Sequence, residues 1–158
     1  EALTFADTVV VMHDGAVVQM GSPEELFDKP AHTFVGYFIG SPGMNLLAAS
    51  VEGASATVGG ATIELPRAYR GLPKTGVEIG IRPEFATLAA PGAGIPVRVR
   101  RIDDLGARRI ARVELGGLPV TAIAPEGLSL DGDAASITFD RSRIHVYSGG
   151  ARVEGEAA

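Results

Sequence analysis

The chain contains 158 residues with a formal net charge of −5; 46% of the residues are hydrophobic and 21% are charged. These values are typical of a globular protein. They leave room for one ordinary domain, or for a small domain with a structured extension. Cysteine is absent, which excludes a disulfide scaffold, thiolate metal sites and thiol nucleophiles. The densest apolar run, residues 9–12, is far too short to span a bilayer.

Charge is distributed unevenly along the chain. Residues 1–66 contain one base and eight acids, residues 67–112 contain ten bases and four acids, and residues 113–158 contain three bases and seven acids. The basic middle segment is therefore either an anion-binding face or a set of solvated strand edges, and both interpretations stay open at this point.

The first apolar segment predicts a β-hairpin. The runs 9–12 and 17–20 are joined through Asp14-Gly15. Asp and Gly both tolerate the positive φ angles that a tight hairpin turn requires. We therefore expect two antiparallel strands here, preceded by the end of a helix over residues 1–6.

Two short helices are predicted after the hairpin. Ser22 can cap the first one, Pro23 fits its first position, and Glu25 three residues after the cap completes a capping box. The second covers residues 31–39, where apolar side chains four apart form one face, and a Gly-Ser-Pro-Gly stretch at residues 40–43 ends it. A hairpin and two short helices bury little apolar surface by themselves, so this piece is expected to belong to a larger α/β domain.

From about residue 44 the hydrophobic period changes from helical to alternating. Val77, Ile79 and Ile81 alternate with less apolar neighbours, and similar runs recur between Gly-containing turns up to residue 148. Many short strands at this spacing predict a mainly β fold, as a small barrel or sandwich. We divide the chain into an α/β piece (1–43), a β-barrel (44–148) and a tail that frays (149–158).

Motifs for catalysis are not found. The stretch 71–76 has a proline where a phosphate-binding loop needs its second glycine. The three histidines have no neighbour at metal-ligand spacing. Asp103-Asp104 places two carboxylates together, but a turn between strands is the favoured interpretation. The sequence thus predicts no catalytic residue, no cofactor site and no metal site in this chain.

A free-standing OB-type binder of nucleic acid or of a small anion is an alternative of another class. It predicts oligonucleotide binding that weakens as salt rises. Tyr69 and Phe85 are the only aromatic residues between 67 and 112, which is a poor platform for base stacking. Since this alternative also leaves residues 1–40 unexplained, nucleic acid is not an expected partner.

Several stretches carry a resemblance to a known family. FADTVVVMHDG at residues 5–15 runs into VQMGSPEELF at residues 18–27, and FIGSPGMN follows at residues 38–45. With GIRPE at residues 80–84 and the strand IHVY at residues 144–147, they resemble the ATP-binding subunit of an ABC importer. The similarity is to the maltose and glycerol-3-phosphate (carbohydrate) group. Polyamine, iron or oxyanion importers, which use related barrels, remain an alternative.

The resemblance implies a fold and a role. The β part would be an OB-like barrel of the TOBE type, a regulatory domain, and residues 1–43 would be the C-terminal remnant of the ABC ATPase domain. In the family pattern the phosphate loop, signature motif, catalytic carboxylate and switch histidine all lie earlier than Glu1. The chain itself is therefore not expected to be an enzyme, whereas the full-length subunit would be an ATPase that uses ATP and Mg²⁺.

The resemblance also implies partners and a location. The barrels of two copies would pair as a homodimer, and the full subunit would bind membrane-spanning permease subunits on the cytoplasmic face of the plasma membrane. A regulatory protein or small molecule is a further possible partner. Arg82 and Glu84 are candidates for a structural or interface role, with a plain strand end and solvated charges as the equal alternative. Asn45 is expected to be a turn former that joins the two domains.

Overall fold

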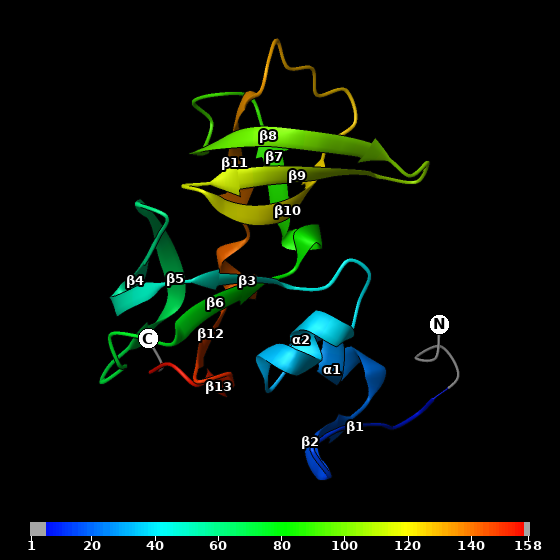
Figure 1. Cartoon of the computed structure of the whole chain (residues 1–158), viewed down its shortest axis with the longest axis vertical. Helices are drawn as coiled ribbons and strands as arrows, with labels where there is room; N and C mark the ends of the chain where they lie inside the picture. Colours follow the sequence, from blue (N-terminus) through cyan, green and yellow to red (C-terminus); the bar gives the residue numbers. More distant parts are fainter. Residues whose placement is uncertain (1–5, 157–158) are drawn as a thin grey trace.

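The computed structural model of the chain describes residues 6–156. The helix end expected over residues 1–6 lies outside this part except for Ala6, which is not helical. Figure 1 shows three regions: a hairpin with two helices, a central sheet with a β-hairpin beside it, and a closed barrel at the opposite end. The predicted mainly β fold with a small α/β piece in front is confirmed.

The α/β piece forms as the local sequence predicts. Strands β1 (Val9–His13) and β2 (Ala16–Gly21) pair antiparallel, and the turn residues Asp14 and Gly15 adopt positive φ angles of 50° and 76°. Helix α1 (Pro23–Asp28) is capped by Ser22, whose hydroxyl accepts a hydrogen bond from the amide of Glu25.

Helix α2 (Thr33–Phe38) is shorter than predicted. Its cap is His32, whose Nδ1 accepts a hydrogen bond from the Phe34 amide at 3.0 Å. The carbonyl of Ala31 instead accepts from the amide of Arg152, and His32 forms a β-bridge with Ala151. Residues 31 and 32 therefore pair with the segment 151–152, and their backbone groups are not available to form a first turn of the helix.

The central sheet has four antiparallel strands in the order β13-β12-β6-β3, beside a separate two-stranded hairpin. The sheet strands are β3 (Asn45–Ala48), β6 (Val77–Ile81), β12 (His145–Ser148) and β13 (Ala151–Val153). The hairpin consists of β4 (Ser50–Val58) and β5 (Ala61–Tyr69). The sheet therefore joins segments from both ends of the predicted β part.

The closed barrel has five strands in the order β10-β7-β11-β8-β9. They are β7 (Ala86–Ala89), β8 (Ile95–Asp104), β9 (Arg109–Leu115), β10 (Leu118–Ala124) and β11 (Ala134–Phe139). The chain enters the barrel from β6 through the 3-10 turn η2 (Pro83–Phe85) and returns to β12 through η3 (Arg141–Arg143). The barrel is thus smaller than the range 44–148, because alternation shows which residues form strands but not which strands pair.

One hydrophobic core runs through the sheet, the β4–β5 hairpin and the barrel. It includes Leu65 from the hairpin, Ile79 from the sheet and Leu88, Val113 and Ile137 from the barrel, all at most 2% exposed. These three β structures therefore form one packed unit, which we call the β-domain (residues 45–153).

The tail differs from the expectation that it frays after Ser148. Residues 151–153 form β13 against β12, and Glu156 bridges to Ala68. Arg152 also donates from its side chain to the carbonyl of Lys29. These contacts with three other parts of the chain hold the segment in place, and none of them is visible from its Gly- and Ala-rich composition.

Candidate functional site

Arg82 lies between β6 and η2 and connects both helices to the β-domain. Its side chain is buried, with 3% of the residue exposed. Nε donates to the carbonyl of Phe27 at 3.1 Å, and Nη1 donates to the carbonyls of Gly36 and Ile39. The carbonyls at a helix C-terminus have no partner within the helix. One guanidinium therefore satisfies backbone groups at the ends of α1 and α2, and Arg82 is not a solvated charge.

The carbonyls of five consecutive residues, 27 to 31, all accept hydrogen bonds from the β-domain. Arg82 donates to the carbonyl of residue 27, as described above. His145 Nε2 contacts the carbonyl of residue 28 at 2.7 Å, and Arg152 Nη1 donates to the carbonyl of residue 29 at 2.7 Å. The Tyr147 hydroxyl donates to the carbonyl of residue 30 at 2.8 Å, and the Arg152 amide donates to that of residue 31. We call these carbonyls and their four donor residues the 27–31 latch.

Burial sets the protonation states of the latch. It lowers the pKa of His145, an effect that the hydrogen bond to the Asp28 carbonyl partly opposes. A carbonyl only accepts, so the neutral imidazole carries its proton on Nε2. Burial also raises the pKa of Tyr147 far above its usual range and lowers that of Arg82, where the nearby Glu84 carboxylate opposes the shift. The Tyr147 hydroxyl therefore remains a donor at neutral pH.

Glu84 lies on η2 and pairs with Arg108, which links the barrel to the loop that follows α2. Its Oε1 accepts from Arg108 Nη1 at 3.2 Å, and Nη2 of Arg108 donates to the carbonyl of Ser41 at 3.0 Å. Arg82 Nη2 and Glu84 Oε2 are buried without a hydrogen-bond partner among residues 6–156. The candidate pair Arg82 and Glu84 thus occupies the junction between the helices and the β-domain.

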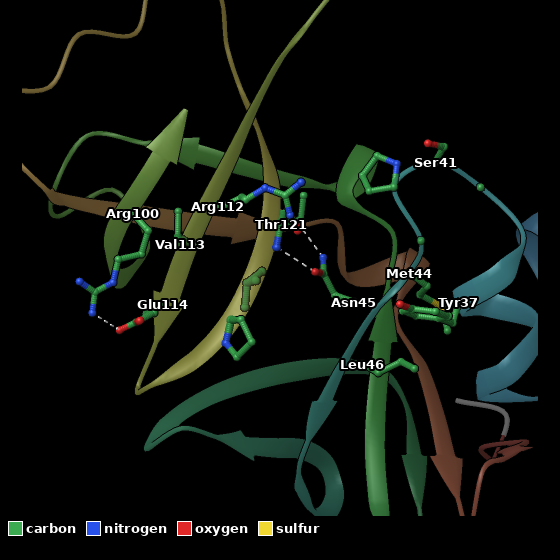
Figure 2. A pocket seen from close by; sticks show the side chains of 15 residues that line it. Tyr37, Ser41, Met44, Asn45, Leu46, Arg100, Arg112, Val113, Glu114 and Thr121 are labelled. Atoms are coloured by element: carbon green, nitrogen blue, oxygen red, sulfur yellow. Dashed lines mark hydrogen bonds and ion pairs between the residues drawn. The ribbon is translucent and has the colours of Figure 1, made fainter. Parts of the chain in front are cut away.

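Asn45 joins the central sheet to the barrel. It is the first residue of β3 and is 8% exposed, so the expectation that it forms a turn was wrong. Its Nδ2 donates to the Thr121 carbonyl at 2.8 Å, while its Oδ1 accepts from the Thr121 amide at 2.8 Å (Figure 2). The side-chain amide therefore pairs with β10 as a neighbouring strand would.

A groove opens beside this contact, between residues 40–46 and strands β9 and β10 (Figure 2). It has a volume of about 680 Å³ and is lined in part by Tyr37, Asn45 and Arg112. Arg100 and Glu114 form an ion pair of 2.8 Å at its wall. The groove thus follows the boundary where the segment after α2 meets the barrel.

The basic middle segment is largely neutralised by the fold. Within the described residues, five of its barrel arginines form ion pairs, namely Arg98–Asp133, Arg100–Glu114, Arg101–Asp103, Arg108–Glu84 and Arg112–Asp103, whereas Arg109 donates to the carbonyl of Leu128. Asp103 and Asp104 are the last two residues of β8 and pair with β9 rather than forming the expected turn, although Asp104 accepts a hydrogen bond from the amide of Gly106 in the turn that follows. The barrel side of the segment therefore forms solvated strand edges rather than an open anion-binding face.

Two classes of site are not found in the part of the chain that the structure describes. Residues 6–156 contain no group of three or more His, Cys, Asp or Glu side chains placed to hold a metal ion. None of the helices within the same residues is long and apolar enough to cross a membrane.

Three residues of the latch were missed by the sequence interpretation: His145, Tyr147 and Arg152. A signal was present for two of them. His145 and Tyr147 are two apart in a strand, so they share one face, opposite the buried Ile144 and Val146. The sequence does not show that this face meets the end of α1, because the partners lie 117 residues apart.

Comparison with known proteins shows two domain families that the β-domain matches. Residues 40–85 match the MalK OB fold domain and residues 79–147 match the TOBE domain. The chain carries a MalK-type OB and TOBE domain. These adjoining matches run from the segment after α2 to β12, and they confirm the resemblance drawn from the sequence.

The curated relatives of this TOBE-domain chain are import ATP-binding proteins. It is 38% identical to an sn-glycerol-3-phosphate import ATP-binding protein of Rhizobium johnstonii, over 94% of this chain and 42% of that protein. It is 37% identical to the trehalose/maltose import ATP-binding protein of Thermococcus litoralis, over 93% of this chain and 44% of that protein. The chain thus spans less than half the length of these relatives.

A solved structure supports the fold. The molybdate-bound form of the cytoplasmic molybdate-binding protein ModG superposes with a TM-score of 0.52 and 17% sequence identity. The match covers 66% of this chain and 95% of the ModG chain. At this identity the likeness concerns the fold alone.

Proposed function

We propose that this chain is the regulatory portion of the ATP-binding subunit of an ABC importer for sugars or for glycerol 3-phosphate. The names of its relatives support these two solute classes. In this proposal the full subunit binds ATP with Mg²⁺ and hydrolyses it. It pairs with a second copy through the β-domain and binds permease subunits on the cytoplasmic face of the membrane.

The 27–31 latch is the observation that carries the proposal. Helices α1 and α2 belong to the stretch that resembles the ATPase domain, whereas the four donor residues belong to the β-domain. Five consecutive carbonyls held by buried or half-buried donors leave little freedom between the two parts. The Asn45–Thr121 contact extends this rigid connection into the barrel. A displacement of the ATPase domain would therefore carry the whole β-domain with it.

The exposed face of the β1–β2 hairpin also supports the proposal. Val10, Met12, Val17 and Met20 on this hairpin are between 48% and 65% exposed. A cluster of exposed apolar side chains marks an interaction surface. In our proposal the remaining part of the ATPase domain covers this surface.

The test uses the complete subunit reconstituted with its permease partners in liposomes. We expect ATP hydrolysis together with uptake of glycerol 3-phosphate, maltose or trehalose. Replacing Arg82 by Met should lower solute uptake more than nucleotide binding, because the connection between the two parts is weakened while the nucleotide site is intact. Uptake of none of the three solutes, or equal uptake by the variant when both proteins are folded, would contradict the proposal.

Pairing of two copies is tested separately by sedimentation of this chain over a range of concentrations. A paired β-domain predicts a monomer–dimer equilibrium. A sedimentation coefficient that stays at the monomer value up to millimolar concentration would argue against the homodimer. That outcome would leave the importer assignment itself unchanged.

A further inference from the structure

A second cavity lies beside the latch, where β5, β12 and β13 meet the end of α1. It has a volume of about 420 Å³. Lys29, Arg67 and Arg152 bring three cations to its wall, and Glu154 brings the single carboxylate. The wall also carries three neutral polar side chains, which are Tyr69, Ser142 and His145.

The cations of this cavity are not all neutralised. Arg152 contacts Glu154 with both Nε and Nη2 and donates from Nη1 to the carbonyl of Lys29. The side chains of Lys29 and Arg67, in contrast, have no ion pair or hydrogen bond within residues 6–156. The wall therefore keeps two unpaired positive charges, which distinguishes it from the neutralised arginines of the barrel.

Tyr69 adds an unused donor. The residue is 7% exposed, and its hydroxyl makes no hydrogen bond within the described part of the chain. Burial, followed by the nearby Glu154 carboxylate, raises the pKa of this phenol. The hydroxyl therefore keeps its proton at neutral pH and offers it to an acceptor in the cavity. The hydroxyl is not among the fully buried side-chain atoms that lack a partner, so it is accessible from the cavity.

We infer that this cavity binds a phosphate group, either inorganic phosphate or that of a small phosphate monoester. A dianion matches the two unpaired charges of Lys29 and Arg67, and the Tyr69 hydroxyl supplies a neutral donor beside them. Cationic donors make the strongest hydrogen bonds to phosphate oxygens, and arginine presents a planar fork to them. A single carboxylate ligand would leave one of the two charges unpaired.

The position of the cavity suggests what binding would do. Lys29 belongs to the 27–31 latch and Arg67 to the β4–β5 hairpin, so a phosphate between them would tie that hairpin to the end of α1. Arg152 and His145 line the cavity and hold two of the latch carbonyls. If the chain acts as we propose in an importer, the bound anion would stiffen the connection to the ATPase domain. Only this consequence rests on the proposed function; the binding itself does not.

The test is a titration of the isotope-labelled chain with sodium phosphate, followed by amide NMR at constant ionic strength and pH 7.5. We expect saturable shifts confined to residues 28–29, 67–69, 142–146 and 152–154. Arg67→Ala and Lys29→Ala should each weaken binding by about tenfold, because each removes one charged hydrogen bond. Tyr69→Phe should weaken it by a smaller factor, since only the neutral hydroxyl is lost.

Arg70→Ala is the matched control, because Arg70 lies three residues from Arg67 and is exposed like it, but it pairs with Glu156 and does not line the cavity. It should bind phosphate as the unchanged chain does. Equal weakening by Arg70→Ala, shifts that rise linearly without saturation, or shifts at other residues would overturn the inference. Thermal unfolding of each variant verifies that a loss of binding is not a loss of folding.

A parallel titration with glycerol 3-phosphate separates the two sources of the phosphate group. Tighter binding of the ester assigns the cavity to a phosphate monoester, and tighter binding of the free ion assigns it to inorganic phosphate. Absence of saturable binding for both excludes the site. Since the measurement uses this chain alone, it stays decisive even if the importer experiment fails.

Discussion

Arg82 contacts Phe27 in two ways: its Nε donates to the Phe27 carbonyl at 3.1 Å, and its guanidinium carbon lies 4.1 Å from the centroid of the Phe27 ring. The same side chain thus holds the backbone and covers the ring of one residue at the end of α1. A guanidinium suits this position because it is planar, stacks on aromatic rings and carries several donors in fixed directions.

Replacing Arg82 by Met should lower the free energy of unfolding by about 3 kcal/mol. Methionine fills part of the volume but leaves the carbonyls of Phe27 and Ile39 without the Arg82 donor, while that of Gly36 keeps only the Met44 amide. Breaking a buried charged network is costly. Urea denaturation measures the change. Arg98→Met is the control, since Arg98 pairs with Asp133 on the surface and should cost at most about 0.5 kcal/mol. An equal decrease in the free energy of unfolding for the two variants would show that the contacts of Arg82 with the helix ends do not stabilise the fold.

Tyr147→Phe should destabilise the chain by about 1.5 kcal/mol, because it removes one buried hydroxyl and leaves the Pro30 carbonyl unsatisfied. The ring and its packing are retained, so the change isolates a single hydrogen bond of the latch. Tyr37→Phe serves for comparison, since Tyr37 is 65% exposed. Thermal unfolding should shift for Tyr147→Phe and stay within error for Tyr37→Phe; the reverse order would contradict the latch.

Asn45→Ala should speed the hydrogen exchange of the Thr121 amide by at least tenfold, because that amide donates to Asn45 Oδ1 and its protection follows from this bond. The amide of Ala122, the next residue in β10, should change much less and provides an internal control. Uniform acceleration along β10 would mean that the variant loosens the barrel as a whole. No acceleration at Thr121 would mean that the side-chain pair is not formed in solution.

Stability should depend on pH through His145. Its pKa is lowered in the folded state, so below about pH 6.5, the ordinary value of the imidazole, the unfolded chain binds more protons than the folded one. The free energy of unfolding should therefore fall as the pH drops from about 6.5 towards the lowered pKa, and be fully retained above that range.

His145→Gln should flatten this dependence, because glutamine can still donate to the Asp28 carbonyl but does not titrate. Urea unfolding of both proteins between pH 5.5 and 7.5 provides the comparison. His13→Gln, at an exposed hairpin position, controls for the loss of any histidine. If His145→Gln kept the full pH dependence, another group would be responsible for it.

Local patterns of the chain were sufficient to predict the elements that depend on neighbouring residues. The Asp14-Gly15 turn and the Ser22 cap formed as expected, since each is a bond or dihedral preference within a few residues. The alternation of Val77, Ile79 and Ile81 likewise predicted a buried strand face. The alternation could not show which strands belong to the barrel, because apolar side chains recur at every second residue both in the strands of the barrel and in those of the central sheet.

The residues that form the junction could be named from the sequence, but their partners could not. Arg82 and Glu84 stood out only through a family resemblance, and Asn45 was assigned to a turn although its partner, Thr121, lies 76 residues away. The same applies to Tyr147 and Pro30. Sequence by itself determined the hairpin, the helix start, the strand periodicity and the family, all of which depend on local chemistry or motif order. Only the tertiary structure decided which donors meet the carbonyls of residues 27–31, because such pairing depends on how distant segments pack.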